Sequence, residues 1–216
     1  MRLIMLGLGA LLWAQERPLV KIGKLQYGGG GDWYGNRASL SNLLKYVQQH
    51  APIPVQLQEE VVRPAAPNLH EFSLLYASGH GNIEFSPEEV ENLRKYLLRG
   101  GFLLIDDDYG MHEYAKRALL QILPEGQFQL IPDNHPIFHC YYDFPYGLPK
   151  VHEHDNKAPQ LYGLFYQGRL VAALTYEADL GDGWEDPQVH KDPPEVRELA
   201  FRMGVNILCY VLTHAW

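Results

Sequence analysis

Apolar and polar residues alternate in blocks along the chain, and the blocks predict strands that are each followed by a helix. The stretch LVKIGKLQY, from Leu19 to Tyr27, has the apolar spacing of a first strand. Behind Ser39, apolar residues recur at helical spacing; they are Leu40, Leu43, Leu44 and Val47. The stretches PVQLQEEVV (54–62) and FSLLYASGHGN (72–82) predict a second and a third strand, and the long apolar run of the third is typical of burial on both faces.

The clearest helix signals lie in SPEEVENLRKYLLRGG, residues 86–101. Ser86 suits the N-cap, Pro87 suits the first helical position, and Glu89 completes a capping box. Gly100 is expected to end the helix. The stripe that this helix would bury consists of Val90, Leu93 and Leu97.

The following segments continue the alternation. GFLLIDDDYG (101–110) predicts a buried strand that ends in three acids, and a further helix is expected from Tyr114 to Leu123. After QFQLIP the pattern loosens into a long loop from Asp133 to Pro159. The run LYGLFYQGRLVAALTY (161–176) then predicts a hairpin that turns at Gln167-Gly168.

A closing helix is expected to run through Val211, with Asp192 and Glu195 available to cap it. Together these elements predict one α/β domain over residues 19–216. Its expected fold is a doubly wound, mostly parallel sheet with helices on both faces, of the flavodoxin-like kind, plus the late hairpin.

The first fourteen residues, MRLIMLGLGALLWA, predict a short secretory signal peptide. Arg2 supplies the basic start, the apolar run extends from Leu3 to Trp13, and Ala14 is the small residue before a polar stretch. The run is shorter than the roughly 20 residues that a membrane span needs. We therefore expect a periplasmic or secreted protein without a membrane span after cleavage near Gln15, and an uncleaved anchor is the alternative.

Composition and charge narrow the classes of partner and cofactor that the chain is expected to bind. The chain has 216 residues and a formal net charge of −8, which argues against nucleic-acid binding because that requires a basic face. Export also disfavours a soluble nicotinamide cofactor, and no cofactor is predicted. The two cysteines are too few for a disulfide framework or a thiolate zinc site, although they could pair.

The glycine-rich stretch LQYGGGGDWYGN (25–36) does not fit a phosphate loop. Such loops also need a lysine and a hydroxyl residue, and neither follows here. Asp32 would repel a phosphate, whereas Trp33 and Tyr34 offer flat faces of the kind that stack on sugars. The alternative is a tight turn whose aromatic residues fold back onto the core.

Several strings together resemble the bacterial domain of unknown function 4159 family: YGGGGDWYGN, SGHGNIEFSPEEVENLRKYLLRGGFLLIDDDYG, DNHPIF and AFRMGVN. The resemblance covers nearly all of the expected mature chain. It implies a fold like those of class I glutamine amidotransferase-like and trehalose-utilisation-like proteins. It also implies that the domain often accompanies bacterial envelope proteins. It implies no reaction, because the activity of the family is not established.

The chain departs from glutamine amidotransferases at the residue that would carry their chemistry. Those enzymes place a nucleophilic cysteine on a sharp turn after a central strand, and the corresponding turn here reads IDDDYG. Cys140 falls in a loop after IFH, and Cys209 lies on the buried-looking stripe of the last helix. We therefore expect structural thiols and no hydrolysis of glutamine.

Polar side chains gather at the expected carboxyl ends of the strands, where doubly wound sheets bind ligands. Ser78 and His80 end the third strand, and three acids end the fourth. Because strand side chains alternate, Asp106 and Asp108 are expected to share a face, which suits a general acid and base or an oxygen-ligated cation. The alternative is that Asp107 or Asp108 caps the next helix.

Two histidine motifs have a functional and a structural interpretation. His80, between glycines in SGHGN, could act as a base or metal ligand, or could bond only to a neighbouring strand end. His135, in DNHPIF, resembles the His-Pro-Ile of trehalose-utilisation-like proteins, and the proline after it already marks a defined turn.

Two later motifs add further acids, histidines and an aromatic residue. In VHEHDN a metal could take His152 and His154 with Glu153 or Asp155, and a solvated loop is the alternative. The string DLGDGWEDP contains Asp179, Asp182, Trp184 and Glu185. Its aromatic residue beside acids suits a sugar-binding cleft, unless Trp184 only covers the edge of the sheet.

Two functions follow from these motifs. The first is a noncatalytic exported domain that binds a carbohydrate, a peptide or an envelope partner in the cleft at the strand ends. Its expected ligand-binding residues are Asp32, Trp33, Tyr34, Ser78, Asp182 and Trp184. The second is a hydrolase, which a metal could assist, and its expected catalytic residues are His80, Asp106, Asp108 and His135. The oligomeric state and the metal stay open.

Overall fold

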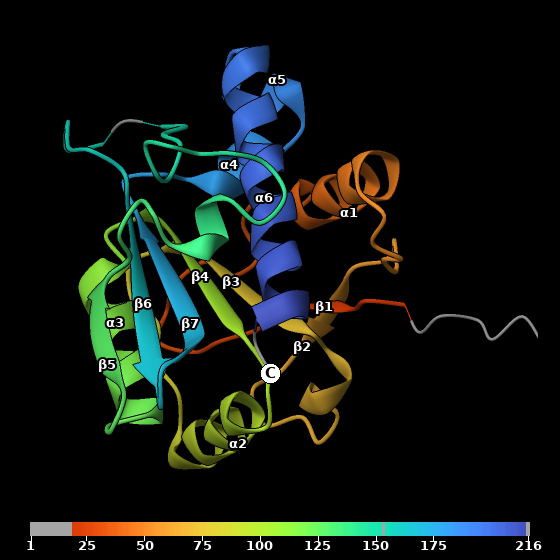
Figure 1. Cartoon of the computed structure of the whole chain (residues 1–216). Helices are drawn as coiled ribbons and strands as arrows, with labels where there is room; N and C mark the ends of the chain where they lie inside the picture. Colours follow the sequence, from red (N-terminus) through yellow and green to blue (C-terminus); the bar gives the residue numbers. More distant parts are fainter. Residues whose placement is uncertain (1–18, 153, 215–216) are drawn as a thin grey trace, which may run out of the picture.

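The computed structural model describes residues 19–152 and 154–214, which form a seven-stranded sheet in the order β2-β1-β3-β4-β7-β6-β5 (Figure 1). The predicted signal peptide lies outside the described residues. The strands are β1 (Ile22–Leu25), β2 (Glu60–Val62), β3 (Leu74–His80), β4 (Leu103–Tyr109), β5 (Gln127–Leu130), β6 (Gln160–Tyr166) and β7 (Arg169–Tyr176). The helices are α1 (Ser39–His50), α2 (Pro87–Leu98), α3 (His112–Ile122), α4 (Leu180–Trp184), α5 (Pro187–His190) and α6 (Pro194–His214), with short 3₁₀ turns at Leu69–Glu71 and Pro136–Phe138.

The sheet is mixed, which corrects the expectation of a mostly parallel sheet. β2, β1, β3, β4 and β7 pair in parallel, whereas β6 is antiparallel to both β7 and β5. The antiparallel part arises because the predicted hairpin at Gln167-Gly168 does form and reverses the chain from β6 into β7. β5 then adds to the outer edge of this hairpin.

Helices cover both faces of the sheet, as expected for an α/β fold. One apolar cluster packs α1, α4 and α6 on one face, and a second packs α2 and α3 on the other (Figure 1). The central strands contribute side chains to both clusters, since neighbouring residues such as Leu74 and Leu75 point to opposite faces. This double burial explains the continuous apolar runs of β3 and β4.

Local signals account well for α2. The Ser86 side chain accepts the Glu89 N–H, and the Glu89 carboxylate accepts the Ser86 N–H, so the predicted capping box is present. Gly100, at φ +102°, lies just beyond the helix end in the left-handed conformation that favours glycine. The predicted buried stripe holds for Leu93 and Leu97, with Tyr96 as its third buried member, while Val90 is only partly buried.

The long loop after β5 packs against α6. Buried Asn206 of α6 accepts the Tyr142 N–H at 2.7 Å, and its side-chain amide donates to the Tyr142 carbonyl at 2.8 Å. Apart from the 3₁₀ turn, the described part of the loop has no regular element. The loop therefore covers α6 and leads on to His152, close to the carboxyl ends of β4 and β7.

In the described part of the chain, no helix combines the length and the apolar character needed to cross a lipid bilayer.

Candidate functional site

Carboxylates and imidazoles gather at the carboxyl ends of β4 and β7. We call this group the carboxylate–histidine cluster; its members are Asp108, Asp179, Asp182, Asp192, His152, His154 and His190. They come from β4, the loop before β6, the β7–α4 connection with α4, and the segment around α5. The four carboxylates lie in buried surroundings, and the three rings are partly exposed.

Asp106 is the anchor beneath this cluster. One carboxylate oxygen accepts the Thr175 hydroxyl at 2.6 Å, and the other accepts the Gly181 N–H at 2.6 Å. The Leu180 N–H and the Tyr76 hydroxyl lie at 3.3 Å. Burial raises the pKa of Asp106, and the hydrogen bonds from Thr175, Gly181 and Leu180 oppose the rise. Because Asp106 is fully buried and bonded on both oxygens, it holds the start of α4 in place rather than facing a ligand.

Gly181 is required for this close approach of α4 to β4. A Cβ at this position would lie 2.5 Å from the Tyr76 hydroxyl, 3.0 Å from the Asn36 amide and 3.2 Å from an Asp106 oxygen. Only glycine therefore lets the first turn of α4 reach the Asp106 carboxylate. The next residue, Asp182, is then held in the cluster.

Asp108 shares the face of Asp106, as predicted. Asn36 bridges two carboxylates, since its side-chain amide contacts Asp108 at 3.3 Å and Asp182 at 2.8 Å. Burial, together with the charges of Asp106 and Asp182, raises the pKa of Asp108 well above its usual range. Burial and the same two neighbours raise the pKa of Asp179 to about 10.

The imidazoles contact the other carboxylates. His152 Nδ1 lies 2.7 Å from Asp182 Oδ2, and its Nε2 lies 2.8 Å from Asp192 Oδ1. His154 bonds Asp179 through Nε2. His190 Nε2 lies 3.4 Å from Asp182 Oδ1. Asp192, which the sequence suggested as a helix cap, is thus an ion-pair partner of His152.

The backbone around the cluster is unusual. Of the six described non-glycine residues with positive φ, four lie in or beside the cluster: Asn36, Glu177, Asp179 and Lys191. Left-handed backbone costs free energy at such residues and persists only where surrounding contacts enforce it. The left-handed backbone conformation of Asp179, at φ +52°, is held in this way by the packing of α4 against β4.

Asp107 points to the other face and caps α3. Its carboxylate accepts the N–H groups of Met111 at 2.7 Å and His112 at 3.0 Å. This was one of the alternatives open from the sequence. Burial raises the pKa of Asp107 to about 6. The N–H groups of Met111 and His112 favour the charged carboxylate and oppose this rise.

The glycine-rich loop brings Asp32 to His80. Asp32 Oδ1 accepts the His80 N–H at 2.6 Å, and Oδ2 lies 3.1 Å from His80 Nδ1. Gly29, at φ +96°, turns the loop against Glu84, where a Cβ would lie 2.8 Å from the Glu84 nitrogen. Backbone hydrogen bonds also join Gly28 to Glu84 and Gly31 to Asn82, after β3. His80 lies outside the cluster, with its side chain 57% exposed.

The predicted aromatic ligand surface is not formed as expected. Trp184 is 1% exposed, packs on Tyr76 and donates its indole N–H to the Ala200 carbonyl, so it lies in the core and offers no face to a ligand. Trp33 is partly buried against the core cluster of α2 and α3, and Tyr34 is exposed. Ser78 is buried. The structure thus separates Trp184 from Trp33 and Tyr34.

His135 also lies apart from the cluster. Its Nδ1 accepts the Ile137 N–H at the start of the 3₁₀ turn, and its ring packs against Phe165 and Tyr210. Burial lowers the pKa of His135. Of the four residues predicted for catalysis, only Asp106 and Asp108 come together.

An open pocket of about 670 Å³ adjoins the cluster at the same edge of the sheet. We call it the tyrosine pocket, because its walls include Tyr109, Tyr114, Tyr162 and Tyr176, together with His112 and His154. The His112 ring packs between Tyr162 and Tyr176, with centroids 4.9 and 4.8 Å away, and the His154 ring stacks on Tyr109 at 4.7 Å. His154 therefore belongs both to the pocket wall and to the cluster.

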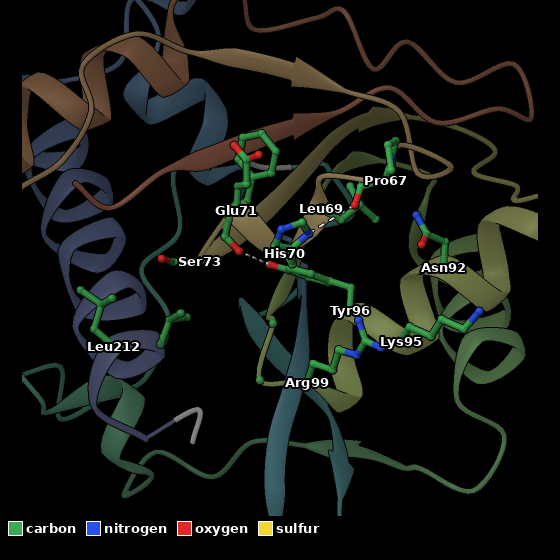
Figure 2. Close-up of a pocket in the computed structure, with 14 residues that line it drawn as sticks. Pro67, Leu69, His70, Glu71, Ser73, Asn92, Lys95, Tyr96, Arg99 and Leu212 are labelled. Atoms are coloured by element: carbon green, nitrogen blue, oxygen red, sulfur yellow. Dashed lines mark hydrogen bonds between the residues drawn. The ribbon is translucent and has the colours of Figure 1, made fainter. Parts of the chain in front are cut away.

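A smaller pocket of about 160 Å³ lies at the opposite edge, near the amino ends of β3 and β4 (Figure 2). Tyr96, Arg99 and Glu71 are among the side chains around it. Two of its polar groups already have partners: the Tyr96 hydroxyl accepts the Phe102 N–H, and Glu71 pairs with Lys21. None of the residues predicted for the site line it, so we place the candidate site at the carboxyl edge.

The cysteines lie side by side near α6, away from a nucleophile turn. Both thiols are free, and Cys209 Sγ lies 3.6 Å from the Cys140 carbonyl. Burial, with Cys209 nearby, raises the pKa of Cys140 to about 12.

This shift predicts an unreactive Cys140. Because burial disfavours the thiolate, iodoacetamide should alkylate Cys140 at least about a hundredfold more slowly in the native chain than in urea. Peptide mass spectrometry over a time course measures both rates. Equal rates would contradict the buried-thiol assignment, and loss of any glutaminase activity in Cys140→Ser would contradict a structural role.

Sequence reasoning missed several residues of this edge. His190, Asn36 and the tyrosines were not singled out, and Asp192 was assigned to a cap. The available signal was the density of histidines and acids in VHEHDN and in the segment from Asp179 to Asp192. The sequence alone does not show that the fold brings these two segments together.

The comparisons with known proteins agree with the family resemblance. No curated protein matches the chain. The family model described as Domain of unknown function (DUF4159) matches residues 21–212, and the chain therefore belongs to this family.

Proposed function

We propose that this chain is an exported domain that binds a neutral, ring-bearing ligand, with a carbohydrate as the best match, in the tyrosine pocket. The observation that carries the proposal is the set of four tyrosine and two histidine rings on the walls of an open pocket at the carboxyl ends of the strands. Ligands of open α/β sheets bind at this edge. Tyrosine offers both an apolar face and a hydroxyl, which suits the two faces and the polar rim of a sugar ring.

The charge of the pocket supports a neutral ligand. Its walls carry four carboxyl residues, Asp107, Glu113, Asp155 and Glu177, against one lysine, Lys157. Lys157 already contacts the Tyr176 hydroxyl at 2.6 Å. An anionic ligand would meet net repulsion in this setting, whereas hydroxyl groups can donate to the carboxylates.

Metal-assisted hydrolysis is the second candidate, and the contact of the cluster with the pocket through His154 favours it. The version that used Asp106 for proton transfer loses support, because both Asp106 oxygens are buried and bonded.

We also propose that the parallel strands β2-β1-β3-β4-β7 correspond to a doubly wound, flavodoxin-like core of the glutamine amidotransferase-like kind. Their order supports this, since flavodoxin-like sheets run 2-1-3-4-5.

Replacing Tyr109 with alanine should weaken carbohydrate binding about five- to thirtyfold, which corresponds to about 1 to 2 kcal/mol. Tyr109 is 49% exposed and stacks on His154, so the change removes a ring face from the pocket without opening the core. The probes are neutral tetrasaccharides of glucose and of N-acetylglucosamine, measured by isothermal titration calorimetry.

The matched control is Tyr34→Ala, on the glycine-rich loop, where the ring is 60% exposed. It should leave the affinity unchanged. Loss of binding in Tyr34→Ala with full binding in Tyr109→Ala would move the site to the Asp32–Tyr34 loop. Binding of a peptide or an envelope protein, but of neither saccharide, would replace the carbohydrate assignment by one of the other expected partners.

A further inference from the structure

We propose that His152, Asp182 and His190 form a binding site for a divalent transition-metal ion of the zinc class. Each residue offers one ligand atom, and these three atoms lie within 4.8 Å of one another. They come from three segments: the loop before β6, α4 and α5. In a tetrahedral zinc site the ligand atoms stand about 3.3 Å apart, so an ion needs His152 and Asp182 to separate by about 0.6 Å and the most distant of the three atoms to close by up to about 1.5 Å.

The contacts of His152 give a first independent reason for a cation. Its Nδ1 lies 2.7 Å from Asp182, and its Nε2 lies 2.8 Å from Asp192. Both ring nitrogens therefore face a carboxylate oxygen, as in a histidine that lies between a metal site and a supporting carboxylate. A metal ion can take Nδ1 and the Asp182 carboxylate together, because both are ligand types of zinc. Nε2–H then donates to Asp192, which is the carboxylate–histidine–metal arrangement of many sites.

The surrounding carboxylates give a second reason. One oxygen each of Asp108, Asp179 and Asp192 is buried without a hydrogen-bond partner among the described residues. Asp179 is fully buried, and Asp108 is 2% exposed. All ion pairs of Asp179, Asp182 and Asp192 in the described part of the chain are with histidines, which are charged only when protonated. A divalent ion would supply positive charge to these buried carboxylate oxygens.

The donor types select the class of ion. Two imidazole nitrogens and one carboxylate suit zinc or cobalt, whereas calcium and magnesium prefer oxygen ligands throughout. The side chains of His152 and His190 are 28% and 26% exposed, so solvent reaches this side of the site. A fourth position is therefore open to water or to an exogenous ligand.

The site is independent of the carbohydrate proposal but lies next to its pocket. The His152 and His154 rings have centroids 6.3 Å apart, and His154 lines the tyrosine pocket. A bound ion would stand beside a ligand in that pocket. Metal binding and saccharide binding involve different side chains, so either can fail without the other.

The test uses the purified chain without a polyhistidine tag, stripped with EDTA and titrated with Zn²⁺ by calorimetry. We expect one ion per chain with a dissociation constant of about 1 μM or lower, and a rise in melting temperature. Mg²⁺ and Ca²⁺ should give neither. Co²⁺ should give the visible absorption of a four-coordinate site with nitrogen and oxygen ligands.

The variants His190→Gln and Asp182→Asn should each weaken Zn²⁺ binding about a hundredfold or more. The matched control is His70→Gln, which removes an exposed imidazole beside the pocket at the opposite edge and should leave binding unchanged. Circular dichroism checks that each variant is folded. Equal Zn²⁺ affinity in all three variants, or no Zn²⁺ binding by the wild-type chain, would overturn the proposal.

A second measurement covers the case in which a variant fails to fold. Diethyl pyrocarbonate modifies accessible imidazoles, and peptide mass spectrometry locates the modified residues. Zn²⁺ should protect His152 and His190 in the wild-type chain and leave His70 and His80 as reactive as before. Protection of His70 or His80, with none at His152 and His190, would also overturn the site.

Discussion

Replacing Trp184 with alanine should lower the free energy of unfolding by about 3 to 5 kcal/mol. The indole is 1% exposed and packs on Tyr76, with ring centroids 5.5 Å apart. It also fills the space above Gly204, where an added Cβ would lie 3.1 Å from the indole. Truncation leaves a cavity between α4, α6 and β3 that the close-packed helices cannot fill, and urea denaturation followed by circular dichroism measures the loss.

Two further variants separate the contributions of Trp184. Trp184→Phe keeps most of the ring but removes the N–H that donates to the Ala200 carbonyl at 2.8 Å, so we expect a smaller loss of about 1 to 2 kcal/mol. Tyr34→Ala removes an exposed aromatic residue and should change stability by less than about 0.5 kcal/mol. If Trp184→Ala were as stable as Tyr34→Ala, Trp184 would have to be a surface residue, as a ligand-binding role requires.

The elements that the sequence predicted well are those whose signals are local. Ser86 and Glu89 stand three residues apart and cap α2 through contacts made within one turn. The turn at Gln167-Gly168 likewise depends on a few adjacent residues, with Gln167 at φ +50° and Gly168 at φ +81°. Such features form from short-range geometry, so a reading of neighbouring residues is enough to find them.

The direction and partners of the strands were harder, because they depend on long-range pairing. β5 is a short strand of four residues, QFQL, in which Phe128 is partly buried and the other three residues are exposed. It pairs with residues of β6 that lie 32 to 38 positions later in the chain. The long loop between them let the sequence predict a hairpin but gave no sign that a further antiparallel strand would add to it.

The candidate site was the hardest part to predict. Asn36 and Asp182, 146 residues apart, meet through a 2.8 Å hydrogen bond, and no periodicity relates such positions. Strand alternation did predict that Asp106 and Asp108 share a face and that Asp107 does not. For Trp184, residue type alone misled, because an aromatic residue among acids resembles a ligand surface until α6 is known to cover it.

Replacing Asp106 with alanine should cost about 3 to 5 kcal/mol of stability, and the loss should extend to metal binding. The change leaves the buried N–H groups of Leu180 and Gly181 and the hydroxyl of Tyr76 without their acceptor. Each unpaired donor costs about 1 to 3 kcal/mol, and the relief from burying a charge offsets only part of that sum. Urea denaturation measures stability, and Zn²⁺ calorimetry on the folded variant measures the site.

The conservative variant decides how Asp106 acts. In Asp106→Asn one oxygen becomes an NH₂ group that faces either the Thr175 hydroxyl or the Gly181 N–H, so a donor meets a donor and we expect a loss of about 2 kcal/mol. Thr175 can turn its hydroxyl, although it also accepts the Asp107 N–H at 3.0 Å, which limits that adjustment. The exposed control Asp143→Ala, 76% exposed and paired with His139 among the described residues, should lose less than about 1 kcal/mol. Because Asp106 holds the first turn of α4, which carries Asp182, Zn²⁺ affinity should fall from the wild-type chain to Asp106→Asn and again to Asp106→Ala, while Asp143→Ala matches the wild type. Stability that falls in that order without any change in Zn²⁺ affinity would mean that Asp182 is positioned by Asn36 and the imidazoles alone, and that Asp106 serves the fold but not the site.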